Sequence, residues 1–394
     1  MRALREAVAA QGRVGGTIVL IDAEEHSPPG LDRMCVRAHP PLPDDEGLRD
    51  AVRSALAEIQ DVDVELTRES SRAILANLRG LTRAQARQAI LEVVSADKKL
   101  DGSDIAGVLK AKRRSLGGSG LLEFVESPAD MNEIGGLSQL KRWLKERDQS
   151  LSERARLYGI TPPRGILLLG VQGAGKSLCA KAVATAWQRP LLRLDPGVLY
   201  DRYVGESERR LRDALRQTEA MSPVVLWIDE IEKAFASAAA QSTDGGLSQR
   251  MFGTLLTWMQ EHDEPVFMVA TANNIEALPP ELLRKGRFDE IFFVDLPDAE
   301  ARKRIFEIHL RRRRRNPDAF DLDLLSARAE GYSGAEIEQC VVAALHTAFS
   351  EGAPDVTTEH LVRAVEISPP LSRTMAERLS HLRRWAQGRC VPAD

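Results

Sequence analysis

The sequence has few of the features that stabilise secreted or membrane proteins. Its four cysteines, Cys35, Cys179, Cys340 and Cys390, are scattered and form no CxxC pair. This argues against a disulfide framework or a zinc site and is typical of a reducing compartment, so we expect a cytoplasmic or stroma-like location. No apolar run approaches the roughly 18 residues of a membrane span, and the early run TIVLID is too short and wrongly flanked for a signal peptide. We therefore expect no membrane partner.

Aromatic residues and net charge are also low. Aromatic residues make up 5% of the 394 residues and the formal net charge is -4, so neither stacking platforms nor an overall basic field points to nucleic acid. The seven histidines form no HExxH motif, which argues against a zinc metalloprotease. The run from Arg311 to Arg315 is expected to close a helix that begins near Ala299, because cations favour a helix C-terminus. An acidic or nucleic-acid partner for this run stays open as an alternative.

The most informative motif is GILLLGVQGAGKS, which ends at Ser177. Its apolar run predicts a buried strand, and the following LCAKAVATAW predicts a helix. Between them, GVQGAGKS matches GxxxxGKS/T, in which backbone N–H groups and a helix N-terminus surround a phosphate. Lys176 can reach the β and γ phosphates, and the Ser177 hydroxyl can ligate Mg²⁺. The predicted binding residues are Gly170, Gly173, Ala174, Gly175, Lys176, Ser177 and Leu178.

Two further apolar strands are predicted to end in polar residues. VVLWIDE places Asp229 and Glu230 at the C-terminal end of a strand, where α/β sheets bind their ligands. Asp229 is predicted to hold Mg²⁺ through water, and Glu230 to polarise the attacking water. VFMVATANN ends in polar residues, of which Asn273 could orient water near the γ phosphate or, alternatively, only cap a loop.

Together these motifs resemble the AAA family of ATPases, within the wider AAA+ class, from about Met131 to Ala364. The resemblance implies an α/β fold: a P-loop AAA+ core with a parallel sheet and a C-terminal helical lid. It also implies ATP and Mg²⁺ as cofactors, ATP hydrolysis, and a homo-oligomer, expected to be a hexamer. In EIGGLSQLKRWLKE, it places Ile134, Gly135 and Gly136 near the adenine base.

The same resemblance assigns residues that act between subunits. Arg284 and Arg287 match the two arginine fingers, which reach into a neighbouring subunit's ATP. The run YVGESERRL is similar to the family's pore loop, so Tyr203, Val204 and Gly205 are expected to face a central channel.

The lid and the sensor position show where this sequence departs from other patterns. GYSGAEIEQCV resembles the lid, and Ala335 stands where other AAA+ branches carry an arginine. Ser177 replaces the commoner threonine. An extra Ala272 separates Thr271 from Asn273, so the sensor assignment depends on counting back from Arg284.

The chain also contains an internal repeat. PPGLDR and PPELLR are each followed by an apolar run and then by PLPD or DLPD. Arg33 and Arg284 are 251 positions apart, and Gly80 and Gly331 are separated by the same 251 positions. A helix-capping pattern follows each glycine, T-x-x-Q in the first copy and S-x-x-E in the second. The spacing also aligns Asp22 with the Asn273 position, so TIVLIDAEE does not correspond to the VVLWIDE strand.

This repeat predicts the domain organisation. Residues 1–122 are expected to be a partial, degenerate AAA+-like module that keeps the last strands and the lid but has no GxxxxGKS/T. A GGSG linker at 117–120 precedes the ATPase core at 123–300, and the C-terminal lid and tail occupy 301–394, with helices followed by a polar tail after Arg389. Either the reading frame begins upstream or the first module is truncated. The pattern is similar to the plastid and cyanobacterial AAA ATPases that carry a degenerate module before the active one.

Two functional hypotheses follow from the sequence. In the first, the ring hydrolyses ATP to remodel a macromolecule, with a protein favoured over nucleic acid as the substrate. In the second, the ATP state switches partner binding, and nothing is threaded through a pore. The two differ in whether Tyr203 is needed.

Overall fold

The computed structural model describes Glu6 and residues 42–116, 122–125, 131–151, 153–195, 206–233, 247–284 and 286–394. The chain divides into two units after Leu42, and every element below lies in the second unit, Pro43–Asp394. The first PPxLxR copy, Asp22, the 117–120 linker and the three predicted pore residues lie outside the described residues. Within the described ranges, no helix combines the length and the apolar character that crossing a membrane requires.

A seven-stranded sheet forms the centre of the ATP-binding region predicted above. Its order is β3 (Leu122–Phe124), β5 (Leu191–Leu194), β6 (Val224–Ile228), β7 (Val266–Ala272), β4 (Gly165–Gly170), β8 (Glu290–Val294) and β9 (Val391–Pro392). All neighbours pair in parallel except β3 and β5, which are antiparallel. The central strands are continuously apolar, as expected for a parallel sheet that is covered on both faces. The predicted parallel sheet is therefore confirmed, with one antiparallel edge strand.

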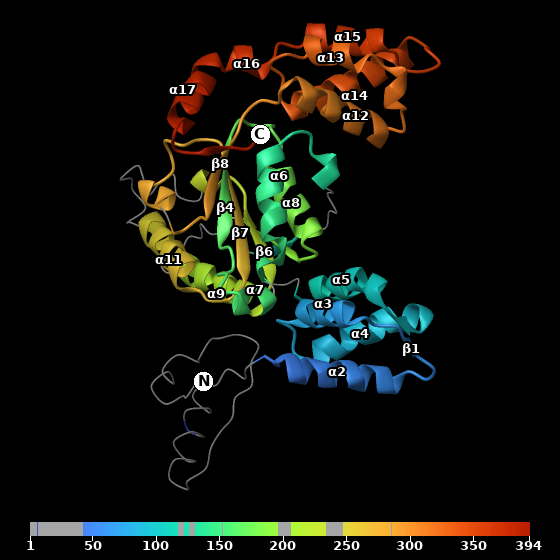
Figure 1. Cartoon of the computed structure of the whole chain (residues 1–394), viewed down its shortest axis with the longest axis vertical. Helices are drawn as coiled ribbons and strands as arrows, with labels where there is room; N and C mark the ends of the chain where they lie inside the picture. The colour runs from blue at the N-terminus through green and yellow to red at the C-terminus, as the bar shows by residue number, and fades with distance from the viewer. Residues whose placement is uncertain are drawn as a thin grey trace. The chain divides into compact units, whose positions relative to one another are not determined.

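Helices cover both faces of this sheet (Figure 1). Because side chains alternate along a strand, Leu167 and Leu169 of β4 pack into one core, whereas Ile166 and Leu168 pack into the other. The first core is closed by α9 (Glu206–Ala220) and α11 (Leu247–Glu261), and the second by α6 (Ser138–Arg147) and α8 (Lys176–Ala186). The short helix α7 (Glu153–Leu157) precedes β4. The run MFGTLLTWM lies in α11, where Met251, Phe252, Leu255, Leu256 and Met259 are buried and Trp258 is partly buried.

Four helices form the C-terminal lid (Figure 1). They are α12 (Ala299–Arg312), α13 (Leu322–Arg328), α14 (Gly334–Ser350) and α15 (Thr358–Ile367), and they enclose their own apolar core around Phe306, Leu325 and Val341. The predicted capping box is present. The Ser333 hydroxyl accepts from the Glu336 amide, and the Glu336 carboxylate accepts from the Ser333 amide.

The last residues differ from the prediction. After α16 (Leu371–Thr374) and α17 (Ala376–Ala386), the expected polar tail returns to the sheet and forms β9, with Val391 opposite Phe292 of β8. Ala393 is buried in the core beneath α6, and its carbonyl accepts from the Gln139 amide. A two-residue strand has too few residues to show a period of two, so the sequence alone did not predict it.

An N-terminal block of four helices resembles the lid in its local chemistry. It comprises α2 (Asp45–Glu58), α3 (Arg68–Leu78), α4 (Arg83–Asp97) and α5 (Ile105–Leu116), with β1 (Asp63–Val64) and β2 (Lys99–Leu100) paired in parallel. Thr82 and Gln85 form the predicted capping box at the start of α4. Gly80 and Gly331 adopt similar positive φ values of 84° and 81°, a conformation that glycine reaches without steric cost. Both members of the 251-residue repeat therefore enter their capped helices through the same backbone turn.

The arginine run ends α12, as predicted. The helix ends at Arg312, and four of the five arginines lie within ion-pair distance of a carboxylate. These contacts favour the structural interpretation of the run over a nucleic-acid partner. The pairs are Arg311–Glu307, Arg312–Glu133, Arg313–Glu338 and Arg315–Asp355.

One buried cation in the N-terminal block predicts a measurable pH dependence. Lys112 of α5 is fully buried, and its Nζ has no hydrogen-bond partner among the residues that the structure describes. Burial, together with the charge of Arg79, lowers the pKa of Lys112 from its usual 10.5 to about 7. Between these two values the unfolded chain binds a proton that the folded chain does not bind. This group therefore makes the free energy of unfolding rise as pH rises from about 7 to 10.5.

We predict that Lys112→Met stabilises the fold by about 1–4 kcal/mol at pH 7, because it removes an uncompensated buried charge. The rise in the free energy of unfolding with pH should disappear in the same variant. Urea unfolding at pH 7 and pH 9.5 measures both effects. Lys110→Met on the exposed side of α5 is the matched control and should change stability by less than about 0.5 kcal/mol. A less stable Lys112→Met variant would contradict the assignment.

Candidate functional site

The predicted phosphate loop joins β4 to α8. Gly173 has a φ of 76°, and a Cβ placed there would lie 3.0 Å from both the Ala335 Cβ and the Ser333 Oγ of the lid. A side chain at this position would therefore strain the backbone and crowd the lid. Gly175 also has a positive φ and immediately precedes α8. The glycine-rich loop therefore leads directly into the N-terminus of α8. Backbone N–H groups of such a loop and helix N-terminus together bind phosphate.

Lys176 lies beneath this loop. Its side chain is only 6% exposed, and its Nζ donates to the carbonyls of Gly170 (2.9 Å) and Val171 (2.7 Å). Burial lowers the pKa of Lys176 to about 8, although the carboxylates of Glu232 and Asp229 act in the opposite direction. The ammonium group therefore has an incomplete set of charged partners, and a phosphate would add the missing anion.

The two predicted Mg²⁺ ligands contact each other. The Ser177 hydroxyl donates to Asp229 Oδ1 at 3.1 Å, although Ser177 lies on α8 and Asp229 follows β6. Thr271 of β7 donates to the same carboxylate oxygen at 2.6 Å and accepts from the Glu230 amide at 2.9 Å. A hydroxyl and a carboxylate are the hard oxygen donors that Mg²⁺ binds alongside substrate phosphates, so this donor set fits the ion.

Glu230 and Asn273 also lie together. Asn273 Nδ2 donates to Glu230 Oε1 at 2.8 Å, and Lys233 pairs with the other carboxylate oxygen. Glu230 has a φ of 49°, an uncommon conformation for a residue with a side chain and one that recurs at functional sites. The backbone N–H of Asn273 donates to Glu232 Oε1 at 2.9 Å, so Glu232 fixes the backbone where the chain leaves β7. The pairing places Asn273 beside the carboxylate predicted to polarise water.

Sequence reasoning missed Thr271 and Glu232. Both lie within two residues of a predicted site residue, yet their roles depend on contacts between neighbouring strands. Thr271 contacts Asp229 across the β6–β7 pair, and Glu232 accepts from a residue that follows β7. A polar residue at the end of a buried strand was the available signal, but the sequence does not specify its partner.

The predicted adenine-side residues lie between α6 and the lid. Ile134 is 4% exposed and belongs to the core that contains α6 and α8. A Cβ on Gly135 would lie 2.5 Å from Ile305 of α12, and a Cβ on Gly334 would lie 3.7 Å from the same isoleucine. Since Gly334 also approaches the Gly173 carbonyl, one lid side chain connects the Gly135 segment with the phosphate loop. Leu178 is half-buried against the same core as Ile134.

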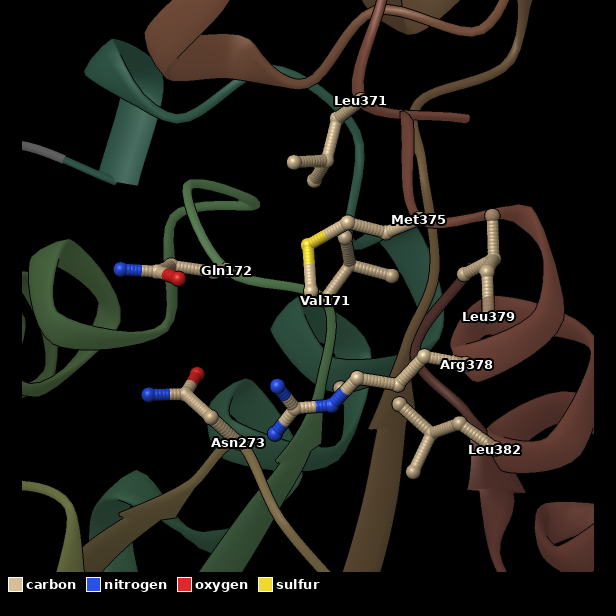
Figure 2. A pocket seen from close by; sticks show the side chains of 9 residues that line it. Val171, Gln172, Asn273, Leu371, Met375, Arg378, Leu379 and Leu382 are labelled. Carbon is tan, nitrogen blue, oxygen red and sulfur yellow. The ribbon is translucent and has the colours of Figure 1, made fainter. Parts of the chain in front are cut away.

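A pocket separates the phosphate loop from the C-terminal helices (Figure 2). The lid helix α14 touches the loop through the Ala335 amide, which donates to the Gly173 carbonyl at 3.1 Å. Glu336 accepts from the Leu371 amide at 2.7 Å and so connects the lid to α16. The pocket is lined by Gly170, Val171, Gln172, Asn273, Leu371, Met375, Arg378, Leu379 and Leu382.

The structure does not bring the two predicted arginine fingers into this site. In the part of the chain that is described, no hydrogen bond or ion pair joins Arg284 or Arg287 to the phosphate loop, Asp229 or Glu230. Arg284 is exposed after the 3₁₀ helix Pro280–Leu283, and Arg287 Nη1 donates to the Glu281 carbonyl. The positions of Tyr203, Val204 and Gly205 lie outside the described residues.

Comparisons with known sequences agree with this geometry. A sequence model described as "ATPase family associated with various cellular activities (AAA)" matches residues 166–296. A model described as "AAA+ lid domain" matches residues 319–363. A third, described as "SpoVK-like AAA ATPase, second domain", matches residues 46–119, the N-terminal block.

Individual relatives extend the similarity to almost the whole chain. The "Uncharacterized AAA domain-containing protein ycf46" of Guillardia theta is 39% identical over 387 residues, which is 98% of this chain and 75% of that protein. The protein of the same name from Pyropia yezoensis is 40% identical over 370 residues, or 94% of this chain and 74% of that protein. A "Proteasome-activating nucleotidase" of Saccharolobus islandicus is 34% identical over 273 residues, or 67% of this chain and 68% of that protein.

The lowered pKa of Lys176 predicts a pH dependence of ATP binding. In the free protein, Lys176 loses its proton as pH rises through about 8. Phosphates favour the charged form, so binding above this pH must take up a proton. ATP affinity should then fall by up to about tenfold per pH unit. Calorimetric titration at pH 7 to 9.5, in buffers of different ionisation enthalpy, measures both affinity and proton uptake. An affinity that stays constant to pH 9.5, or ATP binding without proton uptake above pH 8, would contradict the prediction.

Proposed function

The chain belongs to the AAA family of ATPases, and we propose that it couples Mg²⁺-dependent ATP hydrolysis to the remodelling of a protein within a homohexameric ring. The observation that carries the proposal is the contact network at the ends of β6 and β7. There, Asp229 bonds Ser177 and Thr271, while Glu230 bonds Asn273. One cluster thus contains the Ser177 hydroxyl and the Asp229 carboxylate, which suit Mg²⁺. Beside them lie the Glu230 carboxylate and the Asn273 carboxamide, which suit the binding of a water molecule.

The proposed chemistry assigns one task to each residue. Lys176 and the loop amides neutralise phosphate charge, and Ser177 and Asp229 hold Mg²⁺, which supplies further charge neutralisation. Thr271 positions the Asp229 carboxylate through its 2.6 Å hydrogen bond. Glu230 orients the attacking water and is itself oriented by Asn273. Catalysis of this kind depends on placing charges correctly more than on covalent chemistry.

The ring is proposed because of the arginines that lie away from this cluster. Arg284 is exposed and has no contact with its own phosphate loop among the described residues. We propose that Arg284 and Arg287 reach the ATP of the next subunit, where arginines supplied in trans accelerate phosphate transfer by roughly 10³–10⁵ in related enzymes. Such a site is complete only when two copies of the chain meet.

A protein is the proposed substrate. The similarity to a protein named for proteasome activation supports it, whereas the carboxylate pairs of the arginine run leave less free positive charge for nucleic acid. We propose that Tyr203, Val204 and Gly205 line the pore that contacts this substrate. A cytoplasmic or stroma-like compartment is proposed for the activity, in line with the scattered cysteines.

We also propose that residues 1–122 form a degenerate AAA+-like module before the core (123–300) and the C-terminal lid and tail (301–394). The shared glycine turn and the two capping boxes, each 251 residues apart, support this division. The match of residues 46–119 to a second-domain model supports it as well. Because residues 1–122 contain no GxxxxGKS/T, this module would not bind ATP by itself.

Glu230→Gln should keep ATP bound but stall before hydrolysis, since the amide cannot accept a proton from water. We predict that its mass in solution rises to about six subunits when ATP and Mg²⁺ are added. Light scattering with and without ATP measures this change. Lys176→Met, which should lose ATP binding, is the control and should not respond. A monomer under both conditions would contradict the ring and favour a nucleotide-dependent switch.

Arg284→Ala should lose about 10³-fold or more in ATP turnover while its ATP affinity stays within about twofold, because the residue acts on a neighbour's phosphate. Steady-state hydrolysis and equilibrium ATP binding test the two parts separately. Arg304→Ala is the control, because Arg304 is a partly exposed arginine that pairs with Glu307 within α12. Unchanged turnover in Arg284→Ala would refute shared active sites.

A further inference from the structure

The pocket beside the phosphate loop contains an unassigned cation. One wall is formed by the loop residues Gly170, Val171 and Gln172, and the opposite wall by side chains of α16 and α17 (Figure 2). Among the described residues that line the pocket, Arg378 is the one with a charge. The C-terminal helices therefore bring a guanidinium group to a pocket that is otherwise apolar or uncharged.

Arg378 has no ionic partner in the described part of the chain. Elsewhere on α17, Arg383 makes three hydrogen bonds to Asp295, and Arg384 donates to the Ser380 carbonyl. No comparable contact with a described residue holds Arg378, and Figure 2 shows its guanidinium pointing across the pocket toward Asn273. Arginine stays charged at all working pH values, so this group requires an anion or water.

The pocket borders the groups that are proposed to surround the terminal phosphate. Two of its lining residues, Gly170 and Val171, supply the carbonyls that accept from the Lys176 ammonium group. A third lining residue, Asn273, bonds the carboxylate of Glu230. Lys176, Asn273 and Glu230 are the groups proposed to surround the γ phosphate and the attacking water. Arg378 therefore lines the same pocket as Asn273 and the first residues of the phosphate loop.

The helix that carries Arg378 is firmly anchored. Leu382 lies one turn further along α17 and is 7% exposed within the main apolar core. Arg383 binds Asp295 through both its Nε and its Nη2, which fixes the helix to the end of β8. The Leu371 amide donates to Glu336 of the lid. A side chain on such a support is pre-organised, so it loses little conformational freedom when it binds an anion.

The lid residues that contact Gly173 bring no positive charge to the loop. Ala335 donates its backbone amide to the Gly173 carbonyl and has only a methyl side chain, and Ser333 is uncharged. A cation for this side of the phosphate must therefore come from another element. Arg378 is placed to supply it from the helix that follows the lid.

We propose that Arg378 is a catalytic residue that contacts the terminal phosphate of ATP bound to its own subunit. This inference rests on the ATPase activity and adds to it a cation that acts in cis, in contrast to Arg284 and Arg287. A guanidinium bonded to a phosphate oxygen stabilises the charge that develops during hydrolysis. It also favours ATP over ADP, because ADP lacks the phosphate that Arg378 contacts. The C-terminal helix thereby makes the site sensitive to the γ phosphate.

The first test measures ATP and ADP affinity in the full-length Glu230→Gln protein, which prevents hydrolysis. Adding Arg378→Ala should weaken ATP binding about tenfold and leave ADP binding within about twofold. Arg384→Ala lies on the same helix, is exposed and makes one backbone contact, so it is the matched control and should change neither affinity. Arg378→Lys should recover only part of the ATP preference, since lysine lacks the fork geometry. Equal weakening of ATP and ADP, or no change, would overturn the proposal.

The second test distinguishes action in cis from action in trans. Glu230→Gln subunits retain every arginine, so mixing them with Arg284→Ala subunits should restore hydrolysis at sites that receive a finger from a Glu230→Gln neighbour. Mixing Glu230→Gln with Arg378→Ala subunits should restore nothing, because each subunit then lacks one residue of its own site. Restoration in the second mixture would place Arg378 in a neighbour's site and overturn the proposal. If neither mixture regains activity, the shared ring fails, and the ATP-to-ADP affinity ratio still decides the role of Arg378.

Discussion

The whole site depends on the parallel pairing of β7 with β4 on one side and β6 on the other. The three strands run in the same direction, so their carboxyl ends lie at the same end of the sheet. This end carries Gly170, Asp229 and Asn273. The register then sets which side chains meet, and Thr271 reaches Asp229 across the β6–β7 pair. A shift of one residue would turn Thr271 toward the opposite face of the sheet and break this contact. The pairing of the strands therefore sets the relative positions of the site residues at their ends, and the helices and loops add further side chains to the site.

The electrostatics of the site follow from the burial of charged groups at that end of the sheet. Three carboxylates, those of Asp229, Glu230 and Glu232, act on the buried ammonium group of Lys176. Burial raises the pKa of Glu232 and lowers the pKa of Lys176, so both groups are less stable in their charged forms than they would be in water. A metal ion with a phosphate chain would supply a cation beside the carboxylates and an anion beside the lysine. Such a ligand would complete the charge balance of the site.

The N-terminal block and the lid show how one local device is used twice. Each has a glycine with positive φ two residues before the N-cap of a helix, and each encloses its own apolar core. In the lid, the helix so capped contacts the phosphate loop through the backbone amide of Ala335. The N-terminal block keeps the turn and the cap although residues 1–122 contain no phosphate-loop motif. Local helix chemistry can therefore persist without the ligand site that its counterpart touches.

The sequence by itself determined the parts of this protein that depend on near neighbours along the chain. The phosphate loop, the buried strands, the capping boxes and the end of α12 were all predicted, because each depends on residues within one or two turns or strands. It did not predict that Thr271 bonds Asp229, that the last residues return to the sheet as β9, or that Arg378 faces Asn273. These contacts join segments that are distant in sequence, and a short motif does not specify which distant residue it will contact. Only the tertiary structure decided them, because the packing of α17 and β9 against the sheet sets where those side chains lie.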